Sequence, residues 1–219
     1  MDDREAVAAI VAGDPAGLAD AYDRYATSLY GYCRTMLPPD DAADAVQDTF
    51  VIAAARVSVL RDPRKLRPWL YAVARNECLR RLRSREAPSE IPDVADDSAP
   101  EPHLTAQQRE LRGLVQDAVA GLNPPDRELI ELSLRHELDG AELATVLGVS
   151  RGHAHAMASR ARGQLERSLG ALLVARTGQR SCAELSSMLA GWNGELTVLL
   201  RKRLARHIES CDVCGERKR

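Results

Sequence analysis

Three cysteines and one histidine near the C-terminus have the types and the spacing of metal ligands. His207, Cys211 and Cys214 form a His-x-x-x-Cys-x-x-Cys motif, and Cys182 lies upstream across one helix-length segment. On a helix, His207 and Cys211 lie one turn apart and share a face. Three thiolates and one imidazole suit a closed tetrahedral zinc site, so we predict one zinc ion, structural or redox-responsive. For Cys182, a resolving thiol and a free surface cysteine are the alternative roles.

The composition of the chain favours helices and excludes several classes of protein. Aromatic residues make up only 4% of the 219 residues and β-branched runs are scarce, which favours an all-α fold. No segment is long and apolar enough to span a bilayer, and the charged segment at the N-terminus does not begin a signal peptide. Five scattered cysteines do not form a secreted disulfide framework, and we expect Cys33 and Cys78 in the core. These features predict a cytoplasmic protein with no membrane contact within the chain.

Charge is segregated along the sequence although the net charge is only −2. Residues 1–50 contain ten acidic residues and three arginines, whereas residues 61–85 contain nine basic residues and two acidic ones. Residues 86–101 contain six acidic residues and no basic one. A local basic stripe can bind phosphates while an acidic face meets a basic protein, so the partners must be inferred segment by segment.

The chain divides into three helical segments and one linker. The first domain covers residues 1–85 and the second covers residues 104–176. Residues 86–103, rich in Pro, Asp, Glu and Ser, have too few apolar side chains to order themselves and predict an acidic flexible linker. Residues 177–219 carry the metal motif and form a third, helical module.

Local signals in the second domain predict a helix-turn-helix. Thr105 and Gln108 form a capping box, and Asn123 before a proline is typical of a helix start. Gly148 can supply a tight turn, and Ser150 can cap the helix that follows. A turn of this kind between two helices is a common DNA-binding arrangement.

The helix expected after Pro68 has two different faces. Its buried stripe is expected to contain Leu70, Val73, Ala74, Cys78 and Leu82. A second stripe carries an aromatic, an amide and cations, namely Trp69, Ala72, Asn76, Arg80 and Arg83. Such groups stack on bases, read base edges and neutralise phosphates. The alternative is a solvated helix end that suits the helix dipole, with the tryptophan in the core.

Four motifs in this order resemble a known family: DAVQDTF (residues 44–50), WLYAVARN (69–76), LGVS (147–150) and SRAR (159–162). Over about residues 18–173 the chain resembles the two conserved domains of extracytoplasmic-function sigma factors. These are the bacterial subunits that direct RNA polymerase to promoters. The resemblance implies a non-enzymatic protein that binds core RNA polymerase and promoter DNA, with the acidic linker threading toward the polymerase active-site cleft.

The resemblance assigns roles to individual residues. Those implied to bind polymerase are Asp44, Gln47, Asp48 and Phe50. Those implied to open and bind the −10 element are Arg64, Lys65, Arg67, Trp69, Asn76, Arg80 and Arg83. A helix from Ser150 to Arg167 is implied to enter the major groove at the −35 element, with contacts from Arg151, His155, Arg160 and Arg162. His153, His155 and Met157 replace residues that are often Thr, Lys or Arg in the family, which should weaken phosphate binding.

The segment from Cys182 resembles the zinc-binding anti-sigma fold, whose members usually continue into another helix, so we expect the native chain to extend beyond Arg219. The resemblance implies intramolecular contact between this module and the sigma domains. We expect modest autoinhibition, with a stabilising role as the opposite outcome. Two other classes stay open: a helix-turn-helix regulator that does not replace a sigma subunit, and a sigma-like scaffold that forms no productive holoenzyme.

Overall fold

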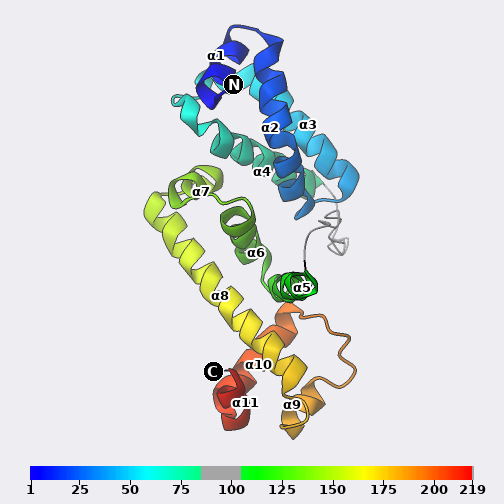
Figure 1. The fold of residues 1–219 in the computed structure, drawn as a ribbon. Coiled ribbons are helices and arrows are strands. Elements are labelled where there is room, and N and C mark those ends of the chain that lie inside the picture. The colour runs from blue at the N-terminus through cyan, green and yellow to red at the C-terminus, as the bar shows by residue number, and fades with distance from the viewer. Residues whose placement is uncertain (85–104, 219) are drawn as a thin grey trace. The chain divides into compact units, whose positions relative to one another are not determined.

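The computed structural model describes residues 1–84 and 105–218, and every regular element in these ranges is helical (Figure 1). The all-α fold class is therefore confirmed. The linker expected at residues 86–103 lies outside the described residues. Across the described ranges, no helix combines the length and the apolar character that a membrane span requires.

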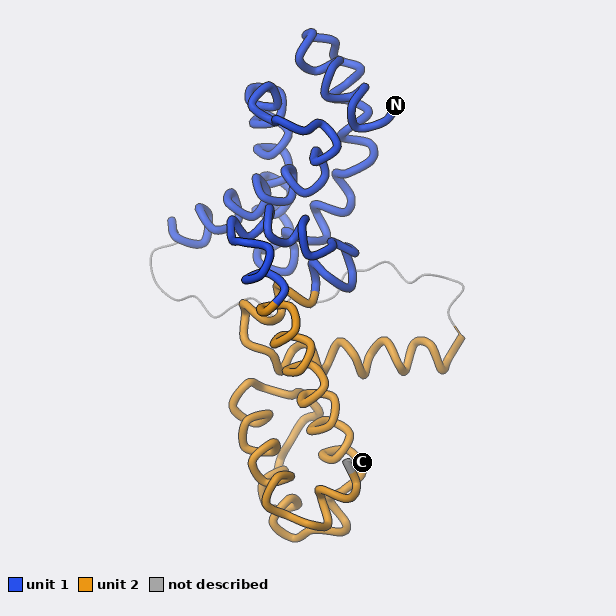
Figure 2. Tube along the Cα trace, turned by 90° about the vertical axis from the view of Figure 1, so that its left-hand side faces the viewer, with its two compact units in different colours: residues 1–97, 131–155 blue, residues 98–130, 156–219 orange. Residues whose placement is uncertain are grey.

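The chain forms two compact units (Figure 2). Unit 1 contains residues 1–97 and 131–155, and unit 2 contains residues 98–130 and 156–219. The division cuts across the expected second domain, because residues 131–155 group with the N-terminal helices.

Helices of unit 1 pack in chain order around a small aromatic and leucine core. Its elements are α1 (Asp3–Val11), α2 (Pro15–Arg34), α3 (Pro39–Arg56), the 3-10 turns η1 (Val57–Val59) and η2 (Pro63–Lys65), α4 (Leu66–Ser84), the π-helical turn η3 (Glu131–Arg135) and α7 (Gly140–Leu147). Helix α2 packs on α1 and α3, and α4 packs on α3 and α7. Cys33 and Cys78 are fully buried, as predicted. Leu82 was wrongly expected in the core; it is 41% exposed because the buried face of α4 ends at Cys78.

The helix-turn-helix consists of α7 and α8 (Arg151–Thr177). The Asp139 carboxylate accepts hydrogen bonds from two backbone amides at the start of α7. Gly148 ends α7 in the left-handed region, at φ 66°, which a residue without a Cβ adopts at little cost. Ser150 Oγ accepts a hydrogen bond from the amide of His153 over 3.3 Å and so caps α8. The sequence predicted both the turn and this cap.

Unit 2 combines the remaining helices of the second domain with the C-terminal module. Its elements are α5 (Ala106–Ala120), α6 (Pro124–Ile130), α8 from residue 156 onward, α9 (Ala183–Met188), α10 (Val198–Ser210) and α11 (Asp212–Lys218). The capping box of Thr105 and Gln108 is confirmed. Helix α8 continues ten residues beyond the expected end at Arg167, because Ala171, Leu172 and Val174 extend its buried face.

The turn between α5 and α6 approaches α8 and the C-terminal module closely. A Cβ at Gly121 would lie 2.9 Å from Ser168 Oγ and 3.0 Å from a methyl carbon of Leu196, so a larger residue would force its neighbours apart. Ser168 Oγ donates a hydrogen bond to the carbonyl of Ala118 over 2.6 Å. Unit 2 is therefore packed through backbone contact as well as through apolar side chains.

A buried histidine joins α4 to the segment before α7 within unit 1. His136 is 6% exposed, and its Nδ1 lies 2.9 Å from the hydroxyl of Tyr71. The rings of Tyr32, Tyr71 and His136 lie within 5.9 Å of one another, and Arg67 donates a hydrogen bond to the His136 carbonyl. Burial, with a smaller contribution from the charges of Arg135 and Arg67, lowers the pKa of His136 to about 4. The imidazole is therefore neutral near pH 7.

Acid should destabilise unit 1 because folded His136 resists protonation. Its pKa of about 4 lies below the ordinary value of 6.5, so the unfolded chain binds more protons between these values. The contribution of neutral His136 is complete above about pH 6.5 and is lost as the pH falls toward 4. From pH 8 to pH 5 the expected loss is roughly 2 kcal/mol of unfolding free energy. Urea unfolding of a Trp192→Phe chain, followed by Trp69 fluorescence, measures it.

The matched variants are His136→Asn and His153→Asn, because His153 is an exposed histidine of the same unit. The first should remove this part of the pH dependence and the second should keep it. A pH dependence that survives unchanged in His136→Asn would contradict the assignment.

Candidate metal centre and nucleic-acid interface

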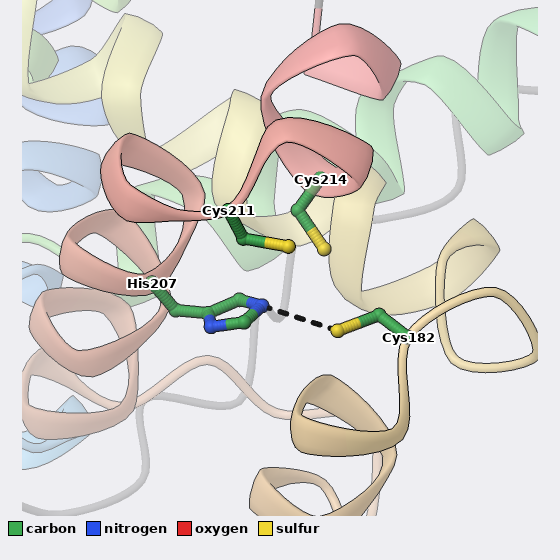
Figure 3. A group of neighbouring side chains, drawn as sticks. All are labelled: Cys182, His207, Cys211 and Cys214. Carbon is green, nitrogen blue, oxygen red and sulfur yellow. Dashed lines mark hydrogen bonds between the residues drawn. The ribbon is translucent and has the colours of Figure 1, made fainter.

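The four predicted metal ligands converge from three helices of unit 2 (Figure 3). Cys182 caps the start of α9, His207 lies in the last turn of α10, and Cys214 lies in the first turn of α11. Cys211 lies between α10 and α11. All four potential ligand atoms lie within 4.8 Å of one another, and His207 and Cys214 are buried. The sequence motif thus identified residues that the fold brings together.

The helix breaks at Cys211, which differs from the expected shared helical face. Cys211 has φ −114° and ψ 114°, an extended conformation. Along an unbroken helix, His207 and Cys214 would be separated by about 10.5 Å of axial rise, too far to bind one ion. The break turns α11 back, so that the Cys214 thiol meets the imidazole. The His-x-x-x-Cys-x-x-Cys spacing therefore works through a helix junction.

The size of the cluster fits a zinc ion. Two sulfurs that are each bound at 2.3 Å to a tetrahedral zinc lie about 3.8 Å apart, and a sulfur and a nitrogen lie slightly closer. Cys182 Sγ and His207 Nε2 are 3.4 Å apart. Three sulfurs and one imidazole nitrogen form the donor set of many structural zinc sites.

The thiols differ in how readily they lose a proton. The Leu185 amide donates a hydrogen bond to Cys182 Sγ, and this bond contributes most to the lowering of the Cys182 pKa. Together with hydrogen bonds to His207 and the other two cysteines, and against the opposing effect of burial, it brings the Cys182 pKa to about 7. Burial raises the Cys214 pKa to about 12. Cys182 therefore supplies the first thiolate near neutral pH, whereas Cys214 ionises only when a cation offsets its burial.

A carboxylate that the sequence analysis missed lies beside the histidine. Glu184 Oε2 is 3.4 Å from His207 Nδ1, while Nε2 faces the cysteines. Histidine ligands commonly donate their second ring N–H to a carboxylate, which fixes the tautomer and the ring orientation. Glu184 follows Cys182 by two residues, and that proximity was the only signal in the sequence.

The C-terminal module bonds to the helices of the second domain through Arg201 on α10. Its Nε donates to the Gly121 carbonyl over 2.7 Å, and its Nη1 donates to Gln164 Oε1 over 2.9 Å. The residue is 5% exposed. Burial and the nearby charge of Arg167 lower the pKa of this guanidinium, and Asp126 opposes them. A buried arginine in an otherwise basic helix gave no sequence signal.

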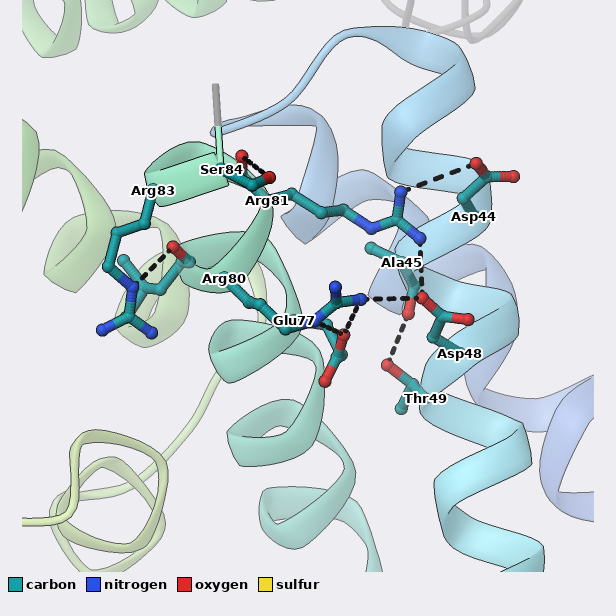
Figure 4. A network of polar contacts seen from close by, with 10 residues as sticks. Asp44, Ala45, Asp48, Thr49, Glu77, Arg80, Arg81, Arg83 and Ser84 are labelled. Atoms are coloured by element: carbon teal, nitrogen blue, oxygen red, sulfur yellow. Dashed lines mark hydrogen bonds and ion pairs between the residues drawn. The ribbon is translucent and has the colours of Figure 1, made fainter. Parts of the chain in front are cut away.

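The residues expected to bind polymerase lie on α3 and have different environments, and Figure 4 shows those of Asp44 and Asp48. Phe50 is buried and its ring lies 4.9 Å from that of Tyr22, so it belongs to the core. Gln47 is exposed. Asp44 and Asp48 face α4 and bind its arginines, as described next.

An ion-pair network joins α3 to α4. Arg81 lies 2.6 Å from Asp48 and 3.5 Å from Asp44, and Arg80 lies 3.3 Å from Asp48 and 2.6 Å from Glu77. Arg81 is the more buried of the two arginines, so it holds the helices together, whereas Arg80 is exposed. The acidic residues expected to bind polymerase and the arginine expected to bind DNA, Arg80, therefore belong to one ion-pair network.

The residues expected to bind the −10 element have different environments. Along α4, Asn76, Arg80 and Arg83 are exposed, and Trp69 is half-buried. In the preceding loop, Lys65 is exposed and Arg64 pairs with Asp62. Arg67 is directed to the His136 carbonyl and lies 4.0 Å from Glu142. The structure thus brings three of these residues onto one accessible stripe and holds Arg67 in an internal contact.

All four residues expected to bind the −35 element are exposed on α8: Arg151, His155, Arg160 and Arg162. Three of them, Arg151, His155 and Arg162, recur at helical spacing and share one face. Arg160 lies on the nearly opposite face, because it stands about 140–180° around the helix from the other three. Ala154, Ala158 and Ala161 form the buried side of the same helical segment.

Two parts of the chain match known protein families. Residues 21–87 match the Sigma-70 region 2 family, and residues 112–165 match the Sigma-70, region 4 family. Over 176 residues the chain is 31% identical to the ECF RNA polymerase sigma factor SigM of Mycobacterium tuberculosis, which covers 78% of this chain and 86% of SigM. It is 26% identical over 155 residues to the RNA polymerase sigma factor SigZ of Bacillus subtilis, covering 69% and 86%.

The fold is similar to that of CnrH in its complex with the cytosolic domain of CnrY, with a TM-score of 0.57 and 27% identity. This similarity covers 77% of the present chain and 97% of CnrH. The Cys/His cluster lies outside both matched family ranges. Regions 2 and 4 occur in their proper order, and more than four-fifths of SigM is covered at this identity. The chain therefore belongs to the extracytoplasmic-function RNA polymerase sigma factors, which are transcription initiation factors and not enzymes.

Proposed function

We propose that this chain binds core RNA polymerase through region 2, directs it to promoters through both regions, and is regulated by its own zinc-binding module. The observation that carries the proposal is the joint presence of the exposed α4 stripe and the exposed face of α8 in a chain of this family. Its place of action is the bacterial cytoplasm, where polymerase and promoters are found.

Helix α4 carries the proposed −10 contact. Asn76 offers an amide that can pair with a base edge, and Arg83 offers a charge for the backbone. Arg80 is already bound to Glu77 and Asp48, so a phosphate must compete with two carboxylates for it. We therefore assign the larger share of −10 recognition to Asn76, Arg83 and the half-buried Trp69.

Helix α8 carries the proposed −35 contact. An α-helix fits the major groove of B-DNA, and the face of Arg151, His155 and Arg162 presents one histidine between two arginines. Arginines neutralise phosphates or read guanine, whereas the imidazole of a histidine offers two ring nitrogens for hydrogen bonding. We therefore expect the −35 contact to be weaker in phosphate binding than one made by an arginine- and lysine-rich helix.

The proposed zinc module is supported by the cluster geometry and by the Glu184 contact to His207. The module spans few residues and its apolar core is small, formed by Leu185, Leu189, Leu196, Leu204 and Ile208, so metal binding would supply part of its folding free energy. Oxidation of the thiols would release the metal, which gives a chemical route to redox control. The zinc module would regulate the sigma regions through intramolecular contact, because only a few residues join the module to region 4.

Reconstituted transcription tests the proposal against its alternatives. Purified chain, core RNA polymerase and a promoter library should yield transcripts that start at selected promoters and depend on the chain. A helix-turn-helix regulator would bind DNA without supporting initiation by core polymerase alone. A scaffold would bind polymerase and yield no promoter-specific transcript.

Replacing Asn76 by Ala should reduce open-complex formation while leaving core-polymerase affinity within about twofold. The exposed amide is lost without a change in the buried face of α4, and one base contact contributes roughly 1–3 kcal/mol, or about 5- to 150-fold. Permanganate footprinting measures the open complex, and fluorescence anisotropy measures the affinity for core. Ser84→Ala, also exposed on α4, is the control. Equal losses in both assays would assign Asn76 to folding.

Charge reversal at Asp48 should weaken core-polymerase binding by about tenfold, in line with the loss of one close interfacial charge contact. Since Asp48 also binds Arg80 and Arg81, helix content and thermal stability are measured by circular dichroism in parallel. Asp44→Lys keeps the Asp48 contacts and should weaken binding with less effect on stability. Asp40→Lys, exposed at the start of α3, is the charge-matched control. Unchanged core affinity in both test variants would remove α3 from the interface.

Protein purified without chelators should contain one zinc ion per chain, and Cys211→Ser should lose it. The variant removes one of the four ligands, and with it one of the negative thiolates that bind the cation. Glu184→Gln should retain zinc with about 10- to 100-fold lower affinity, because the histidine loses the carboxylate that orients it. Elemental analysis and competition with a chromogenic chelator measure stoichiometry and affinity.

Cys33→Ala is the control, because Cys33 is a buried cysteine of unit 1 outside the cluster. It should keep the full zinc content. Full zinc in Cys211→Ser would refute the site.

A further inference from the structure

Helix α10 uses a single face for two contacts. Arg201, Leu204, His207 and Ile208 are buried on α10 at helical spacing. At one end of this face Arg201 bonds to the α5–α6 turn and to α8, and six residues later His207 faces the three cysteines. One continuous helix of 13 residues therefore connects the candidate metal centre to region 4.

The Arg201 contact depends strongly on its hydrogen-bond geometry, because both acceptors are neutral. The guanidinium bonds to a backbone carbonyl and an amide oxygen, and within the described part of the chain it forms no ion pair. The charge of Asp126 favours this cation without direct contact, so the free energy of the buried guanidinium stays low only while both neutral acceptors are in place. A small displacement of α10 would break these hydrogen bonds before water could replace them, and it would also withdraw Leu196 from Gly121.

A second joint connects the same centre to the other end of α8. Arg217, on α11 with Cys214, donates to the Thr177 carbonyl and to Ser181 Oγ, both over 2.9 Å. Gly178 lies so close to Leu185 and Arg217 that a Cβ there would meet the Leu185 side chain at 2.8 Å. The two joints contact α8 at Gln164 and Thr177, so the helices that carry the ligands span the C-terminal half of α8.

We propose that Arg201 is a positioning residue through which metal binding at the Cys/His centre stabilises the α5–α6 turn and helix α8 of region 4. The proposal rests on the zinc site of the proposed function and gives its regulation a positive sign, opposite to the autoinhibition expected from the sequence. Arg160 and Arg162 remain exposed on α8 while α10 is bound, so this contact supports the helix without covering these two side chains.

Hydrogen exchange of the full chain tests the coupling. Wild type, Arg201→Gln and Arg203→Gln are each measured with zinc and after zinc removal by a chelator. Arg203 lies on the exposed face of α10 and is the matched control. Zinc should raise amide protection in residues 118–124 and 164–177 by about tenfold or more in wild type and in Arg203→Gln, a size typical of hydrogen bonds to a charged group.

Arg201→Gln should bind one zinc per chain and lose this gain in protection, and Arg201→Lys should recover part of it. A destabilising role without coupling would lower protection equally with and without zinc. Gln164→Ala removes one acceptor and leaves the arginine in place. If Arg201→Gln does not fold, this variant tests the contact instead. Zinc should raise amide protection less in Gln164→Ala than in wild type.

An equal zinc-dependent gain in Arg201→Gln, or in Gln164→Ala where the former does not fold, would overturn the proposal. If the wild type binds no zinc, the metal part of the proposed function fails and the coupling fails with it. Sigma activity in reconstituted transcription is scored separately and does not depend on either result. If zinc binds to wild type and protection in region 4 does not change, the metal site stands and the Arg201 coupling alone is wrong.

Discussion

Partly or fully buried arginines connect neighbouring helices of this chain through hydrogen bonds and ion pairs. The sequence contains one Phe and only 4% aromatic residues, and many buried positions are alanines that bring helices close but add little apolar area. Arg81 links α4 to α3, Arg67 links α4 to the segment before α7, and Arg201 links α10 to the α5–α6 turn. A planar guanidinium with five donors suits this work, because it satisfies carbonyls and carboxylates at a helix crossing while its stem packs on apolar neighbours.

Because arginines connect the helices, some charged residues that stabilise the fold are also residues proposed to bind polymerase or DNA. Asp48 binds Arg80 and Arg81, so an acidic residue proposed to face polymerase also fixes the helix proposed to face DNA. The two roles are compatible because Arg81 is largely buried and carries the structural contact, while Arg80 is exposed and can exchange carboxylate for phosphate. An exposed ion pair contributes little to stability, so that exchange costs the fold little.

The sequence predicted what is encoded locally. Gly148 ends α7 through its left-handed backbone, whereas Ser150 and the pair Thr105 and Gln108 cap helix starts through side-chain hydrogen bonds to nearby amides, and all act as expected. The candidate metal cluster was also readable, because His207, Cys211 and Cys214 are close in sequence. Glu184, His136 and Arg201 were missed because each acts through partners 23 to 80 residues away, as with Arg201 and Gly121. The break at Cys211 was missed because the motif spacing equally fits an unbroken helix, and only convergence on one ion excludes it.

The covalent link between region 4 and the C-terminal module lowers the free-energy cost of bringing the two into contact. A separate partner loses translational and rotational freedom on binding, whereas a tethered one is already present at high effective concentration. Two arginine joints and the contact of Leu196 with Gly121 can therefore keep α10 and α11 against α8 without a large apolar interface. Because such a contact is held by few groups, the loss of any one of them shifts the population strongly. A metal that orders His207 and Cys214 acts on the two helices that carry Arg201 and Arg217, so a local change in coordination would reach region 4 without a flexible intermediary.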